Sequence, residues 1–209
     1  MAHIGMKYPV AAPWNEDGTY GEGFVVGMAI KFSGTPNKND NTLYADDGVA
    51  ETDKSIKDYG VSLNTDDITL KIHADLMGHT YIPASKPDEG EDGEQIPESM
   101  NVGSEDVAPY VGLGFYKRRR KNNVTTFTAI WLYKTQFSEP NEEAETKGDS
   151  TNFQTPTIEG TAYPTPVKEG EDEKMMIGKK LTFAKESDAR AWLNKMANIG
   201  QKPAAGGGE

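Results

Sequence analysis

Two of the three histidines, His73 and His79, lie six positions apart across the expected end of a helix. Imidazoles that bind one metal ion or form a catalytic triad have to converge on one point, and this spacing suggests neither arrangement. We therefore interpret both rings as polar surface or as partners in a capping contact. The sequence predicts no metal ligands and no catalytic residues.

An acidic segment contains part of a calcium-loop pattern, with Asp88, Asp92 and Gly93 at matching positions. Such a loop needs an oxygen ligand at its third position and a bidentate acid at its twelfth. Those positions hold Gly90 and Ser99. We expect weak, adventitious calcium binding at most.

The glycines Gly21, Gly23 and Gly27 come close to a dinucleotide-binding fingerprint, but their spacing is wrong and they lie inside an expected strand. We interpret them as structural. The motifs G-x-S-x-G, P-loop and H-E-x-x-H are absent. Acids are abundant, but abundance does not define a catalytic pair. The sequence therefore predicts a protein that is not an enzyme and holds no cofactor.

The chain of 209 residues carries 33 acidic against 22 basic residues, a formal net charge of -11 and a pI near 4.8. A molecule of this charge repels nucleic acid as a whole. There is no cysteine, so disulfides and thiolate metal sites are excluded. The first residues lack a leader pattern, and no apolar run approaches the about 18 residues of a membrane span, so we expect a soluble, unexported protein.

Five consecutive cations, Lys117 to Lys121, precede Asn122 and Asn123. The two asparagines tolerate positive φ and predict a two-residue hairpin turn, which fixes the strand register. The expected pairs are Lys121 with Val124, Phe115 with Ile130, Leu113 with Leu132, Gly114 with Trp131, and Gly112 with Tyr133. The rings would cover bare glycine backbone. The cations would lie at a solvated tip and not in a nucleic-acid grip, which interleaves basic residues with aromatics.

Period-two patterning elsewhere predicts a mainly β (α+β) fold. In chain order the pattern predicts a strand over 24–32, a loop over 35–42 that continues irregularly to 54, a strand over 57–63 and a helix over 64–78. Composition then predicts a loop or hairpin tip over 81–106, with an acidic centre. The helix would begin at Asn64 or Thr65 and end at Gly78 in the left-handed conformation.

The C-terminal part begins with an acidic loop after Phe137 and an extended Thr-rich segment. An acidic tip over 168–174 then leads to a strand over 178–185. The last helix would be capped by Ser187 and present Trp192 and other apolar residues on one stripe. Residues 200–209 are expected to form a disordered tail.

Several segments together resemble the major tail tube protein family of long, non-contractile phage tails. They are LYADDGVAETDK, ADLMGH, DVAPYVGLGFYKRRRKNN, AIWLYKTQFSEPNEEAETKGDSTNFQTPTIEG and ARAWLNK. The resemblance extends from Ile4 to Ile199. It implies a single domain over 1–199, a β-sandwich or barrel flanked by one or two short α-helices, with long loops. The insert over 83–104 and the tip near 169–174 are longer than the usual turns of that family.

The resemblance also implies a function. Subunits of this family close into hexameric rings, and the rings stack into a hollow tail tube that delivers DNA to the host. The implied partners are further copies of the chain, the tape measure protein in the lumen, and the tail terminator and distal tail proteins. DNA would pass without specific binding, and no membrane is involved. The implied location is the virion tail, after assembly in the host cytoplasm.

By the same resemblance, the loop over 35–54 would reach the neighbouring ring. The residues expected at contacts between subunits or rings are Leu43, Tyr44, Asp46, Asp47, Glu51, Arg118, Arg119 and Arg120. Those expected to pack the sheet and core are Phe115, Ile130, Trp131, Leu132 and Trp192. Net negative charge suits a lumen that must not hold DNA, and strand edges left free in a monomer can be completed by a neighbour.

A second hypothesis belongs to another class. A monomeric β-sandwich module could bind a carbohydrate if Trp131, Tyr133 or Tyr116 offered an exposed ring for stacking. The cover that these rings give to sheet glycines is the simpler explanation of their positions.

Overall fold

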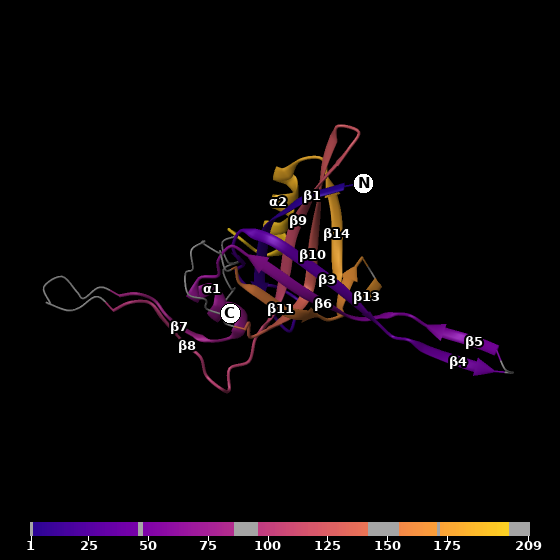
Figure 1. The fold of residues 1–209 in the computed structure, drawn as a ribbon, viewed down its shortest axis with the longest axis horizontal. Helices are drawn as coiled ribbons and strands as arrows, with labels where there is room; N and C mark the ends of the chain where they lie inside the picture. Colours follow the sequence, from indigo (N-terminus) through magenta and orange to yellow (C-terminus); the bar gives the residue numbers. More distant parts are fainter. Residues whose placement is uncertain (1, 46–47, 86–95, 142–154, 171, 201–209) are drawn as a thin grey trace, which may run out of the picture.

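The computed structural model describes residues 2–45, 48–85, 96–141, 155–170 and 172–200 (Figure 1). The fold is mainly β, as the sequence predicts, with two short α-helices. The first strands are β1 (Ala2–Pro13), β2 (Phe24–Val25), β3 (Ala29–Lys38), β4 (Asn41–Ala45), β5 (Gly48–Asp53) and β6 (Ile56–Thr65). Then follow α1 (Leu70–Met77), β7 (Thr80–Ile82), β8 (Ser99–Asn101), β9 (Tyr110–Lys121) and β10 (Val124–Ser138). The last elements are β11 (Thr157–Ala162), β12 (Thr165–Glu169), β13 (Asp172–Met176), β14 (Gly178–Phe183) and α2 (Glu186–Met196).

One large antiparallel sheet has the strand order β2-β1-β9-β10-β11-β6-β3. The long strand β10 changes partner on one side. Its first part pairs with β14, and its last residues pair with β11. Its pairing with β9 shifts register between Leu132 and Thr135, where the two partners exchange. Such an irregularity bends a strand and increases the local twist.

The sheet rolls up so that β3 lies against β1. The ring of Phe32 on β3 lies 4.3 Å from that of Phe115 on β9, measured between centroids. Helix α1 contributes Leu76 and Met77 to the core inside the roll. The other buried residues of this inner core are Ala11, Val26, Val61, Leu63, Val111, Leu113, Leu132, Phe137, Ile158 and Ala162.

Helix α2 covers the other face of the sheet and lies against β10, β14, β9 and β1 (Figure 1). Its residues Ala189 and Leu193 are buried there around Trp131. The indole Nε1–H of Trp131 donates to the Tyr20 hydroxyl at 3.1 Å, and that hydroxyl donates to the carbonyl of Tyr133 at 2.8 Å. Burial raises the pKa of Tyr20 to about 12. The two faces of one sheet therefore carry separate cores.

The predicted β9–β10 hairpin is confirmed. Asn122 and Asn123 have φ of 48° and 62°, and the predicted pairs from Lys121–Val124 to Leu113–Leu132 are present. The predicted pair of Gly112 with Tyr133 is wrong, because the register shift begins after Leu132. Gly112 is instead covered by the Trp131 indole and the Tyr20 ring.

The prediction of one strand over 24–32 is also wrong. Gly27 has φ of 151°, and it separates β2 from β3. A side chain at this position would collide with the carbonyl of Asp67, which lies 2.7 Å from the place of a Cβ. Beyond the break, Met28 is 71% exposed and Ile30 52% exposed. The expected continuous apolar face is therefore interrupted after Val26, and it resumes at Phe32, which packs against the inner core.

The described residues over 35–54 belong to a β-ribbon instead of the predicted loop. Strands β3 and β6 pair as far as Lys38 and Ile56, and β4 pairs with β5 beyond them. The Asn39 N–H donates to the Ser55 carbonyl at 2.9 Å between the two pairs of strands. Figure 1 shows the β4–β5 end projecting far from the body. The antiparallel pairing of β3 with β6 is thus continued by β4 and β5, although the sequence of this segment is polar and does not alternate apolar with polar residues.

The predicted helices are present, but their N-terminal caps are not those expected. Helix α1 is capped by Thr69, whose hydroxyl accepts from Ile72 N–H at 3.4 Å. Neither of the two earlier residues proposed, Asn64 and Thr65, is the cap, because β6 runs to Thr65. The left-handed end at Gly78 is confirmed by its φ of 79°.

Helix α2 begins after Lys185, which offers no side-chain cap. Ser187, the predicted cap, lies inside the helix, where its hydroxyl donates to Asp188 Oδ1 at 3.1 Å. Trp192 is half-buried on the covered side of the helix, with its ring centroid 6.3 Å from that of Phe183.

The acidic insert over 83–104 begins and ends as a hairpin. Strands β7 and β8 pair, and Ser85 forms a bridge with Ile96 beyond them. Residues 86–95, including the calcium-loop pattern, lie outside the described residues, as do residues 201–209 of the expected tail. Within the described part of the chain, neither helix is long and apolar enough to cross a membrane.

Candidate functional site

The residues predicted at contacts between rings lie on the projecting ribbon. Leu43 and Tyr44 belong to β4, and Glu51 on β5 is exposed and pairs with Leu43. Asp46 and Asp47 lie outside the described residues. The structure thus places the described members of this set on one hairpin, remote from the two cores (Figure 1).

The predicted arginines lie at the tip of the β9–β10 ribbon. Arg118 and Arg120 are exposed, and Arg119 is half-buried. Arg120 Nη2 donates to Asn123 Oδ1 at 3.2 Å across the turn. Among the described residues, no carboxylate forms an ion pair with these three guanidinium groups.

The residues predicted to pack the sheet lie in its two cores. Leu132 belongs to the inner core, and Phe115 is fully buried, with its ring tilted against that of Phe32. Ile130 is buried as well. On the outer face, Trp131 is fully buried and Trp192 packs at the edge of the cluster.

The rings proposed as a carbohydrate platform are not exposed to a ligand. Trp131 is 0% exposed, and Tyr116 and Tyr133 are buried too. The hydroxyl of Tyr116 donates to Glu186 of helix α2, and burial raises its pKa. A sugar could stack on these rings only after α2 had been displaced.

Two of the three glycines that resemble a dinucleotide fingerprint have packing roles. A side chain at Gly23 would collide with the carbonyl of Ala197 after helix α2, and one at Gly27 would collide with the carbonyl of Asp67. Both glycines allow a close approach of backbone to backbone.

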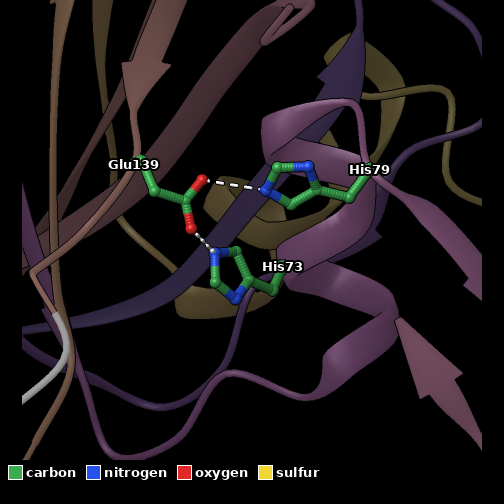
Figure 2. A group of neighbouring side chains, drawn as sticks. All are labelled: His73, His79 and Glu139. Carbon is green, nitrogen blue, oxygen red and sulfur yellow. Dashed lines mark hydrogen bonds and ion pairs between the residues drawn. The ribbon is translucent and has the colours of Figure 1, made fainter. Parts of the chain in front are cut away.

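A cluster of polar side chains that the sequence spacing did not reveal gathers His73, His79 and Glu139 (Figure 2). His73 comes from α1. His79 follows the left-handed Gly78 that ends this helix, and its N–H donates to the carbonyl of Ala74 at 3.1 Å. Glu139 comes directly after β10. The turn at the end of the helix thus brings the second imidazole back beside the first.

The two imidazoles face the same carboxylate. His73 Nε2 lies 2.9 Å from Glu139 Oε1, and His79 Nε2 lies 2.9 Å from Glu139 Oε2. The ring centroids of the two histidines are 5.7 Å apart. The side chains of His73 and His79 are only 13% and 5% exposed, whereas that of Glu139 is 47% exposed. The group therefore opens to solvent on the side of the glutamate.

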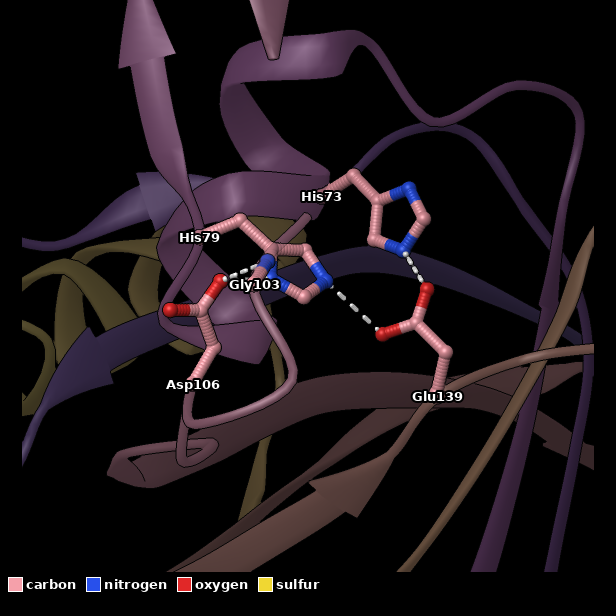
Figure 3. A network of polar contacts seen from close by, with 5 residues as sticks. All are labelled: His73, His79, Gly103, Asp106 and Glu139. Atoms are coloured by element: carbon pink, nitrogen blue, oxygen red, sulfur yellow. Dashed lines mark hydrogen bonds and ion pairs between the residues drawn. The ribbon is translucent and has the colours of Figure 1, made fainter. Parts of the chain in front are cut away.

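A second carboxylate lies on the far side of His79 (Figure 3). Asp106 Oδ2 lies 2.8 Å from His79 Nδ1 and accepts the Gly103 N–H at 2.7 Å. Hydrogen bonding from Gly103, reinforced by His79, lowers the pKa of Asp106. Both nitrogens of one nearly buried ring are thus in contact with carboxylates.

The surroundings of His79 act on its pKa in opposite directions. Burial, the largest single contribution, lowers the pKa, but the hydrogen bonds and charges of Asp106 and Glu139 together outweigh it. The net effect is a raised pKa, so the site favours a positive charge at this position.

The interpretation of these histidines as polar surface is wrong, because both side chains are nearly buried and meet at one carboxylate. A separation of six is unusual for metal ligands within one helix, but here a left-handed cap reverses the chain between the two rings. The predicted C-cap glycine between them was the only local signal of this reversal. Glu139 lies 60 residues further along the chain, and nothing in its own segment indicates this contact.

The fold and the cluster define a mainly β protein built on a rolled antiparallel sheet, with a long projecting ribbon and a histidine–carboxylate group at one end of the roll. Comparisons with known protein families and with curated proteins find no match.

Proposed function

We propose that this chain is the subunit of a hollow tail tube, assembled from rings of identical copies and used as a conduit for DNA. The observation that carries the proposal is the β-ribbon that extends β3 and β6 through β4 and β5, away from the body (Figure 1). The resemblance of the sequence to the tail tube family supports the same conclusion. That resemblance also implies the hexameric symmetry of the rings. It implies the remaining partners as well, which are the tape measure protein, the tail terminator and the distal tail proteins.

The ribbon is a costly element for an isolated molecule. A two-stranded hairpin is at best marginally stable in water, and it needs a third strand or a packing surface to gain stability. The side chains over 51–57 are all exposed, including Ile56 at 49%. A neighbouring subunit or ring would supply the surface that the ribbon lacks, which supports a role in assembly.

The edge of the sheet supports association for a second reason. Strand β3 pairs with β6 on one side only within the described part of the chain, and the exposed side chains of Met28 and Ile30 lie at its start. A free edge beside exposed apolar groups is a template for pairing with another chain. Closing a ring would cover such an edge in every copy at once.

Charge distribution fits the same function. The chain has a formal net charge of -11, while Arg118 and Arg120 concentrate positive charge at one exposed tip. The tip can meet acidic residues of an adjacent copy without creating a basic path for DNA. A conduit with few free cations adds little salt-dependent affinity for the phosphates that pass through it.

Negative-stain electron microscopy of the concentrated, tag-free protein, paired with light scattering, tests the proposal. We expect hollow rings or tubes, or such tubes once an initiator complex is added. A protein that remains monomeric at high concentration and with an initiator would contradict the proposal. A glycan array then tests the carbohydrate alternative, and we expect no hits because its aromatic platform is buried.

A further inference from the structure

We propose that His73, His79 and Glu139 bind one zinc ion, which ties the end of helix α1 to the end of strand β10. The site is independent of the tube hypothesis, because it lies within a single chain and uses no residue of the ribbon or the basic tip. Two imidazole nitrogens and one carboxylate oxygen are a ligand set that suits zinc.

The geometry is close to what the ion requires. One ligand atom from each of the three residues lies within 4.8 Å of the others. Ligands about 2.0–2.1 Å from a tetrahedral zinc ion lie about 3.4 Å from each other. The rings already point with Nε2 toward a common carboxylate (Figure 2). Small side-chain rotations, mainly of the exposed Glu139, would therefore open the space for the ion.

Asp106 prepares His79 to act as a ligand. Its carboxylate accepts a hydrogen bond from Nδ1–H at 2.8 Å, and Gly103 N–H holds that carboxylate in place (Figure 3). In the neutral imidazole this leaves Nε2 with its lone pair directed at the cluster. Metal-binding histidines commonly donate their other N–H to a carboxylate, which fixes the ring and raises its basicity. Asp106 is a positioning residue in this arrangement.

The contact with Glu139 also requires a positive charge. A lone pair on His79 Nε2 would face the lone pairs of Glu139 Oε2 at 2.9 Å, and two acceptors at this distance repel each other. A proton on the imidazole or a metal ion between the atoms removes the repulsion. A metal ion satisfies the second contact, between His73 Nε2 and Glu139 Oε1, at the same time. One divalent cation thus accounts for both imidazoles around one carboxylate.

The ion would act as a structural clamp. It would join α1, the turn into β7 and the end of β10, three segments that are far apart in the sequence. Three protein ligands leave a fourth position for water. Because the unfolded chain does not hold these ligands together, binding stabilises the folded state.

The experiment uses the full, tag-free chain, stripped with a chelator and titrated with zinc in competition with a chromophoric chelator at neutral pH. We expect one ion per chain and a higher unfolding midpoint with zinc. Cobalt titration should give the visible absorption bands of a four-coordinate site. The third histidine of the chain provides a matched control, and the His3→Gln variant should bind as the unaltered chain does.

The ligand variants distinguish this site from unspecific binding. We expect His73→Gln, His79→Gln and Glu139→Gln each to weaken binding more than about 100-fold, and Asp106→Asn to weaken it about 10- to 100-fold. Glu139→Gln is the decisive variant, because its half-exposed side chain is not needed for packing. Circular dichroism checks that each variant folds. Undiminished binding by folded Glu139→Gln, or loss of binding in His3→Gln, would overturn the proposal. Absence of zinc binding by the unaltered chain would overturn it too. In that case a protonated His79 would bridge the two carboxylates.

Discussion

Single residues fix the distance between the sheet and helix α2 in the core on the outer face of the sheet. At Gly114 the missing side chain leaves room for the Trp131 indole and Leu193 of helix α2. The sequence pairing of Gly114 with Trp131 predicted this cover. It did not reveal that the same indole covers Gly112 as well, because the register shift in β10 is a tertiary feature.

We expect Gly114→Ala to destabilise the protein by about 1–3 kcal/mol, the usual cost of overpacking. A methyl group at residue 114 would lie 2.5 Å from Trp131 Cε3 and 2.8 Å from Leu193 Cδ2. Urea unfolding followed by tryptophan fluorescence measures the change. Gly60→Ala is the matched control, because the nearest atom, the Thr35 carbonyl oxygen, is 3.7 Å away. Its effect should stay within about 1 kcal/mol. Equal losses in both variants would contradict the packing argument.

His79 should make stability depend on pH. Its pKa is raised in the folded protein, so its protonated form contributes stability that is complete below the unfolded value of about 6.5. That contribution is lost as the pH rises through the folded value. The facing charged groups are Asp106 and Glu139, with His73 beside them. In chelator-treated protein, the free energy of unfolding should fall as the pH rises above about 6.5, and this fall should be smaller in His79→Gln. Identical pH profiles of the two proteins would contradict the assignment.

At the scale of elements, the sequence predicts the β9–β10 ribbon but does not predict the ribbon that extends β3 and β6. The turn residues Asn122 and Asn123 and the apolar alternation define the first. The second continues through polar residues and Pro36, for which composition predicts a loop. Its strands continue the pairing of β3 with β6, and a contact between two segments leaves no signal in the sequence of either one.

The tip of the β9–β10 ribbon provides a test of electrostatic assembly. Reversing charge with Arg120→Glu and Lys121→Glu should impair ring or tube formation, because repulsion would replace attraction to acids of an adjacent copy. Both side chains are exposed, so the circular dichroism of the monomer should not change. The matched neutral pair Arg120→Gln and Lys121→Gln should have an intermediate effect, measured by light scattering. Tubes formed equally well by all three proteins would show that the tip is only solvated.

At the scale of the whole molecule, we expect the projecting ribbon to be needed for assembly but not for folding of the single chain. Replacing residues 40–54 by Asn-Gly would close β3 and β6 with a short turn, since Asn39 and Ser55 already share a 2.9 Å backbone hydrogen bond. We expect the shortened chain to keep its unfolding midpoint within a few degrees, because the β4–β5 end projects away from the body of the fold (Figure 1). Under conditions in which the full chain forms tubes, we expect electron microscopy to show none. An undiminished yield of tubes would show that assembly does not need the ribbon.

The sequence by itself determined the β-rich class, the register of one hairpin as far as Leu132, the presence of two helices, and the packing of Phe115, Ile130, Trp131 and Leu132 in the interior. These features depend on local periodicity and turn chemistry, which act over a few residues. Only the tertiary structure decided that the sheet rolls up, that β10 exchanges β14 for β11, and that His73, His79 and Glu139 meet. Each of these results joins segments far apart in the chain, so the packing of the complete molecule selects them and no single segment carries their signal.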